Sequence, residues 1–255
     1  MFFIDTHAHL YVEQFENDYN AVIAKALDEG IQKIIFPAID SSTHEVMLKI
    51  EKENPTTIQC MMGLHPCSVK DDYQKEIDLV EQYLHTNKFV AIGEIGLDFY
   101  WDKTFIKQQL AAFNHQMELA LQYKLPINIH TRNATQETIE AVKPFAKRGL
   151  TGIFHCFGGS YETAKQIIQL GFKLGIGGVV TYPKAGLQDT LKHVELEHIV
   201  LETDAPYLTP VPFRGKRNES SYIKIIAQQL AEIKGESIEE IAFVTTENAK
   251  KIYGC

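Results

Sequence analysis

The chain has 255 residues, of which 45% are hydrophobic and 23% charged, and this composition suits one large folded core rather than a disordered or fibrous chain. Its apolar stretches are far shorter than the roughly 20 residues of a membrane helix, and its first residues lack the basic and apolar regions of a signal peptide. The net charge of −8 argues against a nucleic-acid ligand, because phosphates favour basic surfaces, although bound metal would neutralise some carboxylates.

The four cysteines are irregularly spaced and form no CxxC pair: Cys60, Cys67, Cys156 and Cys255. Disulfides are frequent in small secreted domains and rare in cytosolic proteins. In a chain of this length we expect reduced thiols. We therefore predict a cytoplasmic protein that contacts no membrane and needs no obligate protein partner.

Short β-rich runs alternate with amphipathic helical patterns along the whole chain. The expected strands are Phe2–His9, Ile31–Ile39, Thr57–Leu64, Phe89–Leu97, Pro126–His130, Gly152–Phe157, Phe172–Val180 and Ile199–Asp204. Helices are expected between them, for example at Asp102–Tyr123 and Gln136–Val142. Eight such units predict an α/β fold, a closed parallel (β/α)8 TIM barrel that forms a single domain over residues 1–255. An extra C-terminal helix, Ser237–Tyr253, is expected to pack across the bottom or side of the barrel.

The ten histidines fall into two groups by their position in these units. One group lies at or just past the carboxyl end of an expected strand: His7, His9, His65, His130 and His155. The other group lies on helical stretches or just before the last strand, where we expect exposed or capping side chains: His44, His85, His115, His193 and His198. Because barrels of this class place their active sites at the carboxyl ends of the strands, the first group predicts the functional site.

Two carboxylates join the first group of histidines. Alternation along the first strand puts His7 and His9 on one face, from which two imidazoles can chelate one ion. Glu94 ends the fourth strand between Gly93 and Gly96, where the backbone is expected to pass close to a bulky group. The predicted ligands of one or two divalent ions are His7, His9, Glu94, His130, His155 and Asp204. Glu94 is the carboxylate best placed to bridge two ions, and nitrogen-rich sites favour zinc or manganese.

Seven motifs carry these residues and follow one another from residue 3 to residue 220: FIDTHAHL, GLHP, GEIGLDFY, PINIHTR, FHCFGG, LETDAPYL and PFRGKRNES. Together they resemble the TatD family of metal-dependent deoxyribonucleases, which belongs to the amidohydrolase-like barrels. The resemblance implies magnesium as the metal and a 3′-to-5′ exonuclease activity on DNA. Where the family commonly has a proline after the glutamate of the last motif, this chain has Ser220 after Glu219, which puts the rigidity of that loop in doubt.

The resemblance also implies how the ligands are divided. One ion would be held by His7, His9 and Asp204, the second by His130 and His155, and Glu94 would bridge both. Two ions can clamp the attacking and leaving oxygens of a phosphoryl transfer, and a water between them would supply the nucleophile.

Three carboxylates have further expected roles in this arrangement. Asp204, next to that water, is the expected general base, and Glu94 is the second catalytic carboxylate. Glu202 lies two residues before Asp204 and is expected to point into the same barrel interior. It either orients a ligand or a water, or forms a salt bridge inside the barrel.

The residues expected to bind substrate surround these ligands. His65 is not needed as a ligand and is expected to contact a substrate phosphate, as the resemblance implies. The cations expected to bind phosphates near the barrel mouth are Arg132, Arg214, Lys216 and Arg217, the last three in the loop after strand eight. Tyr100 and Trp101, after strand four, could stack on a base or cap the barrel, and the cap is the interpretation we favour.

Three functions remain open from the sequence. The favoured one is a phosphodiesterase, a TatD-type deoxyribonuclease. The second is a related barrel hydrolase acting on an amide, ester or lactone; many binuclear members of that wider group use a carboxylated lysine as the bridge, whereas this chain carries Glu94. The third is a binding scaffold, which would have lost at least one ligand, and this chain has lost none.

Overall fold

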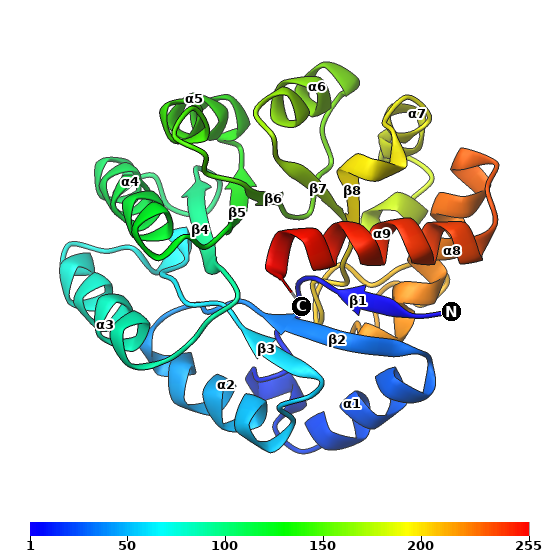
Figure 1. Cartoon of the computed structure of the whole chain (residues 1–255), viewed down its shortest axis with the longest axis horizontal. Coiled ribbons are helices and arrows are strands. Elements are labelled where there is room, and N and C mark those ends of the chain that lie inside the picture. Colours follow the sequence, from blue (N-terminus) through cyan, green and yellow to red (C-terminus); the bar gives the residue numbers. More distant parts are fainter. Residues whose placement is uncertain (255) are drawn as a thin grey trace.

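The structure, a computed structural model, describes residues 1–254, in which strands and helices alternate around a central barrel (Figure 1). The strands are β1 (Phe3–Asp5), β2 (Ile31–Phe36), β3 (Ile58–Cys60), β4 (Ile92–Asp98), β5 (Ile127–Arg132), β6 (Gly152–Phe154), β7 (Lys173–Ile176) and β8 (Ile199–Leu201). Neighbouring strands are parallel and follow the chain order, in one group from β1 to β3 and a second from β4 to β8.

Two short bridges join the two groups of strands into a ring. Met62, just after β3, pairs with Ile92 of β4, and Ala8, after β1, pairs with Ala205, after β8; both bridges are parallel. A closed parallel sheet has no exposed edge, and helices cover its outer face. The predicted (β/α)8 barrel is therefore confirmed.

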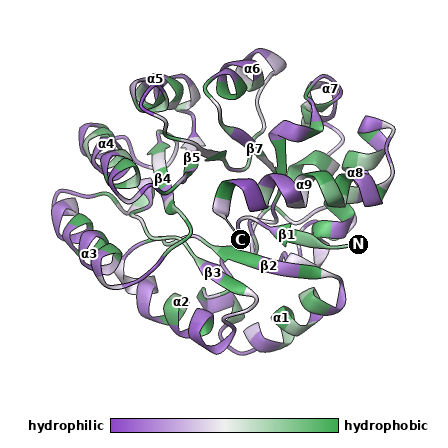
Figure 2. Cartoon of the chain, in the orientation of Figure 1, coloured by the Kyte–Doolittle hydropathy of each residue, from purple (hydrophilic) through white to green (hydrophobic). Residues whose placement is uncertain are grey.

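The helices surround the barrel, and Figure 2 shows hydrophobic residues along the strands and hydrophilic ones on the outer sides of the helices. They are α1 (Tyr19–Asp28), α2 (Ser41–Glu53), α3 (Tyr73–Thr86), α4 (Ile106–Tyr123), α5 (Thr135–Ala146), α6 (Tyr161–Gln169), α7 (Leu187–Leu191), α8 (Ile223–Lys234) and α9 (Ile238–Tyr253). The helix expected from Asp102 begins only at Ile106, because Asp102 accepts the amide of Thr104 at 2.8 Å and so forms a turn. The other, expected at Gln136–Val142, is longer at both ends.

Helix α9 lies across the amino ends of the strands and closes that end of the barrel (Figure 1). The hydroxyl of Thr246 donates to the carbonyl of Phe2 at 3.0 Å, and the side-chain amide of Asn248 donates to the carbonyl of Ile199 at 2.8 Å. Tyr253 enters the interior, where it packs with residues that lie in or next to six strands: Ile4, Ile35, Met61, Ala91, Ile153 and Val200. The expected C-terminal helix is confirmed, and it lies across the bottom of the barrel, which leaves the carboxyl ends of the strands open for a site.

Most strands are shorter than predicted, so that several expected site residues lie in loops. Strand β1 ends at Asp5 rather than His9, and the next amide, that of Thr6, bonds to the carbonyl of Leu201 on the neighbouring strand β8. Strand β8 ends at Leu201, and Asp204 itself has a φ of 56°, outside the range of a strand. Strand β4, in contrast, continues to Asp98, so Glu94 lies inside it and not at its end.

Four of the five histidines expected to be exposed or capping lie partly exposed on the outside of the barrel: His85, His115, His193 and His198. The prediction was wrong for His44, which is only 1% exposed. It lies on the inner side of α2, where its ring meets the edge of Tyr83 on α3 at a centroid distance of 5.2 Å. Helical position alone therefore did not distinguish an outward from an inward histidine.

Two other sequence predictions concern the environment of the protein. None of the helices between residues 1 and 254 is long and apolar enough to cross a membrane. Cys60, Cys67 and Cys156 are free thiols, as expected, whereas Cys255 lies outside the described residues.

Candidate metal centre

Side chains from five segments of the chain converge at the carboxyl end of the barrel. Nε2 of His7 lies 3.1 Å from Nε2 of His9, 3.2 Å from Oε2 of Glu94 and 3.6 Å from Oδ1 of Asp204. Nε2 of His9 is 3.6 Å from each of the same two carboxylate oxygens. Donor atoms about 2.0–2.2 Å from one ion lie roughly 3 to 3.6 Å from one another. The inner atoms of His7, His9 and Glu94 could therefore share one cation, and those of His7, His155 and Asp204 form a second possible group of ligands.

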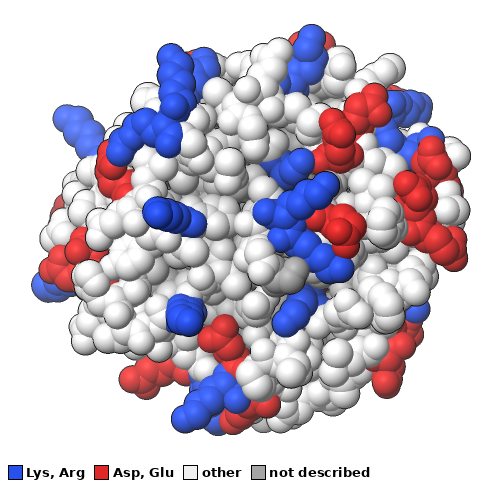
Figure 3. Space-filling view, viewed as in Figure 1, with Lys and Arg blue, Asp and Glu red and all other residues white. Residues whose placement is uncertain are grey.

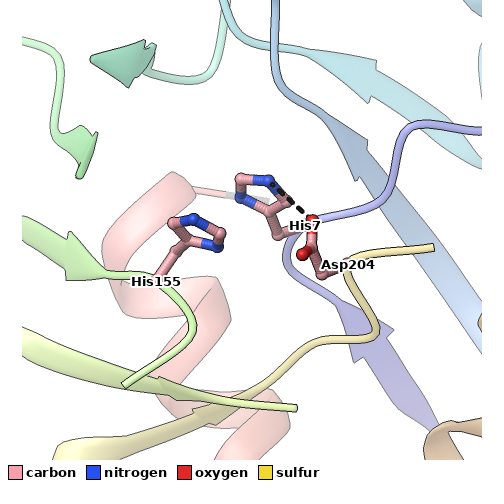
Figure 4. A group of neighbouring side chains, drawn as sticks. All are labelled: His7, His155 and Asp204. Carbon is pink, nitrogen blue, oxygen red and sulfur yellow. Dashed lines mark ion pairs between the residues drawn. The ribbon is translucent and has the colours of Figure 1, made fainter. Parts of the chain in front are cut away.

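Glu94 faces a second group of imidazoles with its other oxygen. Oε1 lies 2.9 Å from Nδ1 of His130 and 2.9 Å from Nε2 of His155. The ring of His155 also stacks on that of His7, with 4.0 Å between centroids, and Figure 4 shows both rings and Asp204 pointing toward one another from three segments of the chain. Each oxygen of the buried Glu94 carboxylate thus faces a different set of nitrogen donors.

The outer nitrogens of His7 and His9 are held by neutral groups. Nδ1 of His7 lies 2.9 Å from Oδ1 of Asn128, and Nδ1 of His9 lies 2.9 Å from the hydroxyl of Tyr11. Tyr11 donates its own proton to the carbonyl of Pro37, so its oxygen accepts from His9. In the neutral state both rings therefore carry a lone pair on Nε2, and these lone pairs face each other. A divalent cation between them would satisfy both, so the donor set fits a metal ion.

The outer nitrogens of the other pair face carboxylates. Nε2 of His130 lies 2.9 Å from Oδ2 of Asp98, and Nδ1 of His155 lies 3.5 Å from Oε1 of Glu202. A carboxylate behind an imidazole fixes its tautomer and makes the inner nitrogen a better ligand. His130 would consequently bind through Nδ1 and His155 through Nε2, the two atoms that face Glu94.

Glu202 is completely buried and tightly enclosed. Its Oε1 accepts the backbone amide of Cys156, directly after His155. A Cβ atom on Gly175 of β7 would lie only 2.1 Å from its Oε2, so only glycine leaves room for the carboxylate. These contacts place Glu202 behind His155, where it could orient that ring or form a salt bridge with it inside the barrel.

The charges of the centre depend on one another. Burial by itself would raise the pKa of Glu94, but the nearby imidazoles of His155, His65 and His7 hold it well below its usual range. Burial would likewise lower the pKa of His155, yet the charges of Glu94 and Glu202 raise it well above its usual value. The buried carboxylates therefore require positive charge, which protons or metal ions can supply.

His65 differs from the other imidazoles, although it lies close enough to Glu94 and His130 to share an ion with them. Its Nδ1 accepts the backbone amide of Cys67 at 3.1 Å. A neutral imidazole that accepts at Nδ1 carries its proton on Nε2, the atom 3.3 Å from Glu94. Since a protonated nitrogen cannot bind metal, His65 is placed as a hydrogen-bond donor beside the centre.

The expected phosphate-binding cations have different surroundings. Arg132 lies over the ring of Tyr100, and Arg214 lies over the ring of Tyr182, with 3.9 and 4.3 Å to the ring centroids. Lys216 is exposed. Arg217, in contrast, forms two hydrogen bonds to the carboxylate of Asp18, at 2.8 and 2.7 Å. On the opposite face, around α9, basic and acidic side chains are interspersed (Figure 3).

The loop after β8 is anchored without the proline that the resemblance led us to expect. The side-chain amide of Asn218 donates to the carbonyls of Thr203 and Tyr207, at 2.7 and 2.6 Å, and Asn218 is completely buried. Glu219 accepts a hydrogen bond from Lys25 of α1 at 2.6 Å. These contacts supply the rigidity that the missing proline left in doubt.

Three residues that contact the ligands were not identified from the sequence: Tyr11, Asn128 and Asp98. The signal for two of them was present. Tyr11 continues the two-residue alternation of His7 and His9, and Asn128 lies two residues before His130, on the same face of β5. Asp98 was left without a role, because its contact with His130 depends on the register between β4 and β5.

Comparison with known proteins agrees with this geometry. The chain matches the family of TatD related DNases over residues 4–254. It is 39% identical over 250 residues to the uncharacterized metal-dependent hydrolase YabD of Bacillus subtilis (strain 168), with 98% of each chain covered. The structure of YjjV, a TatD homolog from Escherichia coli K12, superposes with a TM-score of 0.93 at 31% identity, over 99% of this chain and 98% of that one. A TatD family hydrolase from Entamoeba histolytica superposes at 0.84 with 25% identity, over 99% and 98%. The chain therefore belongs to the TatD-related DNase family of metal-dependent hydrolases.

Proposed function

We propose that this protein is a deoxyribonuclease, a phosphodiesterase that removes nucleotides from the 3′ end of DNA with the help of two divalent ions. The observation that carries the proposal is the position of Glu94, whose two oxygens face separate sets of imidazoles. His7, His9 and Asp204 would hold one ion and His130 and His155 the other, with Glu94 between them. When bound, the ions would polarise the phosphate and lower the pKa of an attacking water.

Asp204 is the group that we assign to accept the proton of that water. Burial by itself raises its pKa, but His9, His155 and His7 lower it below the usual value, so the carboxylate is ionised. Its side chain is 13% exposed, whereas that of Glu94 is only 3% exposed. Of the two catalytic carboxylates, Asp204 is therefore the one that an incoming substrate can reach.

The surrounding residues would hold the substrate. His65 offers an Nε2 proton beside the centre and is suited to a phosphate oxygen. Arg214 and Lys216 are exposed in the loop after β8 and pair with no acidic side chain among residues 1–254. They would contact phosphates beyond the one that reacts, as barrel loops at this position often do. Glu202 would keep His155 oriented. A cytoplasmic location stays a prediction.

The test is an assay of metal-stripped protein on single-stranded DNA and on a panel of carboxylic esters, amides and lactones. Mg²⁺, Mn²⁺ and Zn²⁺ are added back separately, because the nitrogen-rich donor set favours zinc or manganese whereas the resemblance implies magnesium. We expect metal-dependent release of nucleotides from the 3′ end. Hydrolysis of an ester or lactone without any cleavage of DNA would contradict the proposal and support the related barrel hydrolases instead.

A further inference from the structure

Two aromatic side chains stand exposed beside the metal centre. Tyr100 and Trp101 follow β4 and are 50% and 68% exposed, and Trp101 is the most exposed large hydrophobic residue among residues 1–254. Their rings meet edge to face, with 4.9 Å between centroids. The cap that we favoured from the sequence would bury these rings, so the exposure contradicts that interpretation and leaves much of their surface, that of Trp101 above all, open to a ligand.

Arg132 lies against the same two rings. Its guanidinium carbon is 3.9 Å from the ring centroid of Tyr100 and 5.2 Å from that of Trp101. The side chain is exposed and, within residues 1–254, forms no ion pair or hydrogen bond. Arg148 and Arg217, by comparison, each hold a carboxylate with two nitrogens. Arg132 is thus oriented by stacking while its N–H donors remain available for an anion.

A single carboxylate fixes this unit to the metal centre. Oδ1 of Asp98 accepts the backbone amides of Tyr100 and Trp101 at 2.9 and 3.1 Å, and its Oδ2 faces Nε2 of His130 at 2.9 Å. Asp98 is 1% exposed, so both contacts are shielded from water. Arg132 lies two residues beyond His130 on β5. The aromatic pair and the arginine are therefore both tied to His130, a ligand of the candidate metal centre.

We propose that Tyr100, Trp101 and Arg132 form a nucleotide-binding subsite, in which a base stacks on Trp101 and Arg132 contacts an adjoining phosphate. Stacking on an aromatic face tolerates any base, and a guanidinium binds phosphate in a planar, two-pronged geometry. The proposal rests on the proposed function, because it names the part of a DNA strand that is held beside the centre. It adds a base contact to the phosphate contacts of the loop after β8.

Trp101 is the only tryptophan of the chain, so its fluorescence reports on this subsite directly. The metal-loaded protein is titrated with a cleavage-resistant, phosphorothioate-linked oligothymidylate, and with a strand of equal length and charge that lacks all bases. We expect saturable quenching by the first strand and little by the second. Equal quenching by both strands, or none by either, would overturn the proposal. This readout does not require turnover, so it stands apart from a failure to cleave DNA.

Kinetics give a second test. For Trp101→Ala, the KM for an oligonucleotide relative to that for bis(4-nitrophenyl) phosphate is expected to rise roughly tenfold to a hundredfold, the usual effect of losing one stacked base. Trp101→Phe should restore most of this ratio. Phe243→Ala is the matched control. Phe243 is 64% exposed, close to the value for Trp101, but it lies on α9 at the other end of the barrel.

Abasic substrates identify the contact itself. In the wild type, one abasic position along the strand should raise KM as much as Trp101→Ala does, and the same position should have no further effect in the variant. Independent, additive losses would show that the base is bound elsewhere. An equal loss on the small phosphodiester would show that Trp101 only supports Asp98 and His130. Either result would overturn the proposal.

Discussion

The hydroxyl oxygen of Tyr11 lies 2.9 Å from Nδ1 of His9 and donates its proton to the carbonyl of Pro37. Tyr11→Phe removes the acceptor that keeps the proton of His9 on Nδ1 and Nε2 free. We expect the affinity for Mn²⁺ or Zn²⁺ to fall by roughly 10- to 100-fold, the usual effect of losing such an outer contact. Calorimetric titration of metal-stripped protein measures this affinity.

Tyr19→Phe is the control for that substitution. The hydroxyl of Tyr19 donates to Glu53 at 2.9 Å on the surface, so its loss removes a comparable hydrogen bond away from the centre. Metal affinity is expected to stay within about twofold of wild type, since an exposed hydrogen bond away from the ligands contributes only a little to stability and does not orient any of them. An unchanged affinity in Tyr11→Phe would show that packing alone orients His9.

Asp98→Asn tests the carboxylate behind His130. The asparagine can keep one oxygen on the amides of Tyr100 and Trp101, but its NH₂ group then faces Nε2 of His130. The ring must move its proton to Nδ1, the nitrogen that faces Glu94, and can no longer bind metal there. We expect metal affinity and DNA cleavage to fall together by roughly 10- to 100-fold. Asp102→Asn, which alters only an exposed turn, should change neither.

The same carboxylate predicts a dependence of stability on pH. Burial by itself would raise the pKa of Asp98. The hydrogen bonds from His130, Trp101 and Tyr100 lower it by more, so the pKa lies below its usual value in the folded protein. A depressed pKa stabilises the fold above the unfolded-state value of about 3.9, and this stabilisation is lost as pH falls below it. In urea unfolding of chelator-treated protein, wild type should exceed Asp98→Asn in stability near neutrality and lose that advantage below about pH 4. A gap that stays constant with pH would exclude this linkage.

The barrel and the inner residues of the centre were predictable because both depend on short-range periodicity. Alternation along the first expected strand predicted His7 and His9 on one face, and their rings do meet although β1 ends at Asp5. The end of each strand marks one side of the barrel. Glu94 was expected at the end of its strand and lies inside β4, yet it still faces the ligands, because the ladder shifts register between Ile92 and Ile95. The sequence thus predicted the direction of the Glu94 side chain correctly, although it misplaced the end of the strand.

The outer residues could not be predicted in the same way. Asn128 presents its oxygen to His7 because its NH₂ group, at 3.4 Å, faces the hydroxyl of Tyr253 from α9. That contact joins residues 125 positions apart in the chain. Likewise, Arg217 belongs to a basic cluster in the sequence, but the structure pairs it with Asp18 of another loop. Such pairings follow from tertiary packing, which local patterns do not encode.

Glu94→Ala is expected to abolish activity with every metal. Its two oxygens face both sets of imidazoles, so its loss weakens both ion sites at once. The effect should exceed the roughly 10- to 100-fold of the outer-residue variants. His198→Ala is the control, since His198 lies just before β8, at the amino end of the barrel, and contacts Glu197 at 3.4 Å. Equal losses in initial rate for the two variants would contradict the assignment of the centre to the carboxyl end of the barrel.

The loop after β8 allows the phosphate contacts to be separated from a structural ion pair. Replacing Arg214 and Lys216 by alanine should raise the KM for an oligonucleotide and leave turnover of bis(4-nitrophenyl) phosphate close to wild type. If each residue contacts one phosphate, the slope of log affinity against log salt should decrease in magnitude by about 1.4 for a single strand.

Arg217→Ala should not change that slope, because the guanidinium of Arg217 is held by Asp18. The substitution should lower the free energy of unfolding by less than about 1 kcal/mol, since the ion pair is partly exposed. A changed slope in Arg217→Ala would show that the guanidinium leaves Asp18 to bind DNA. An unchanged slope in the double variant would show that this loop does not contact the strand, and the phosphates would then have to be held by Arg132 and His65.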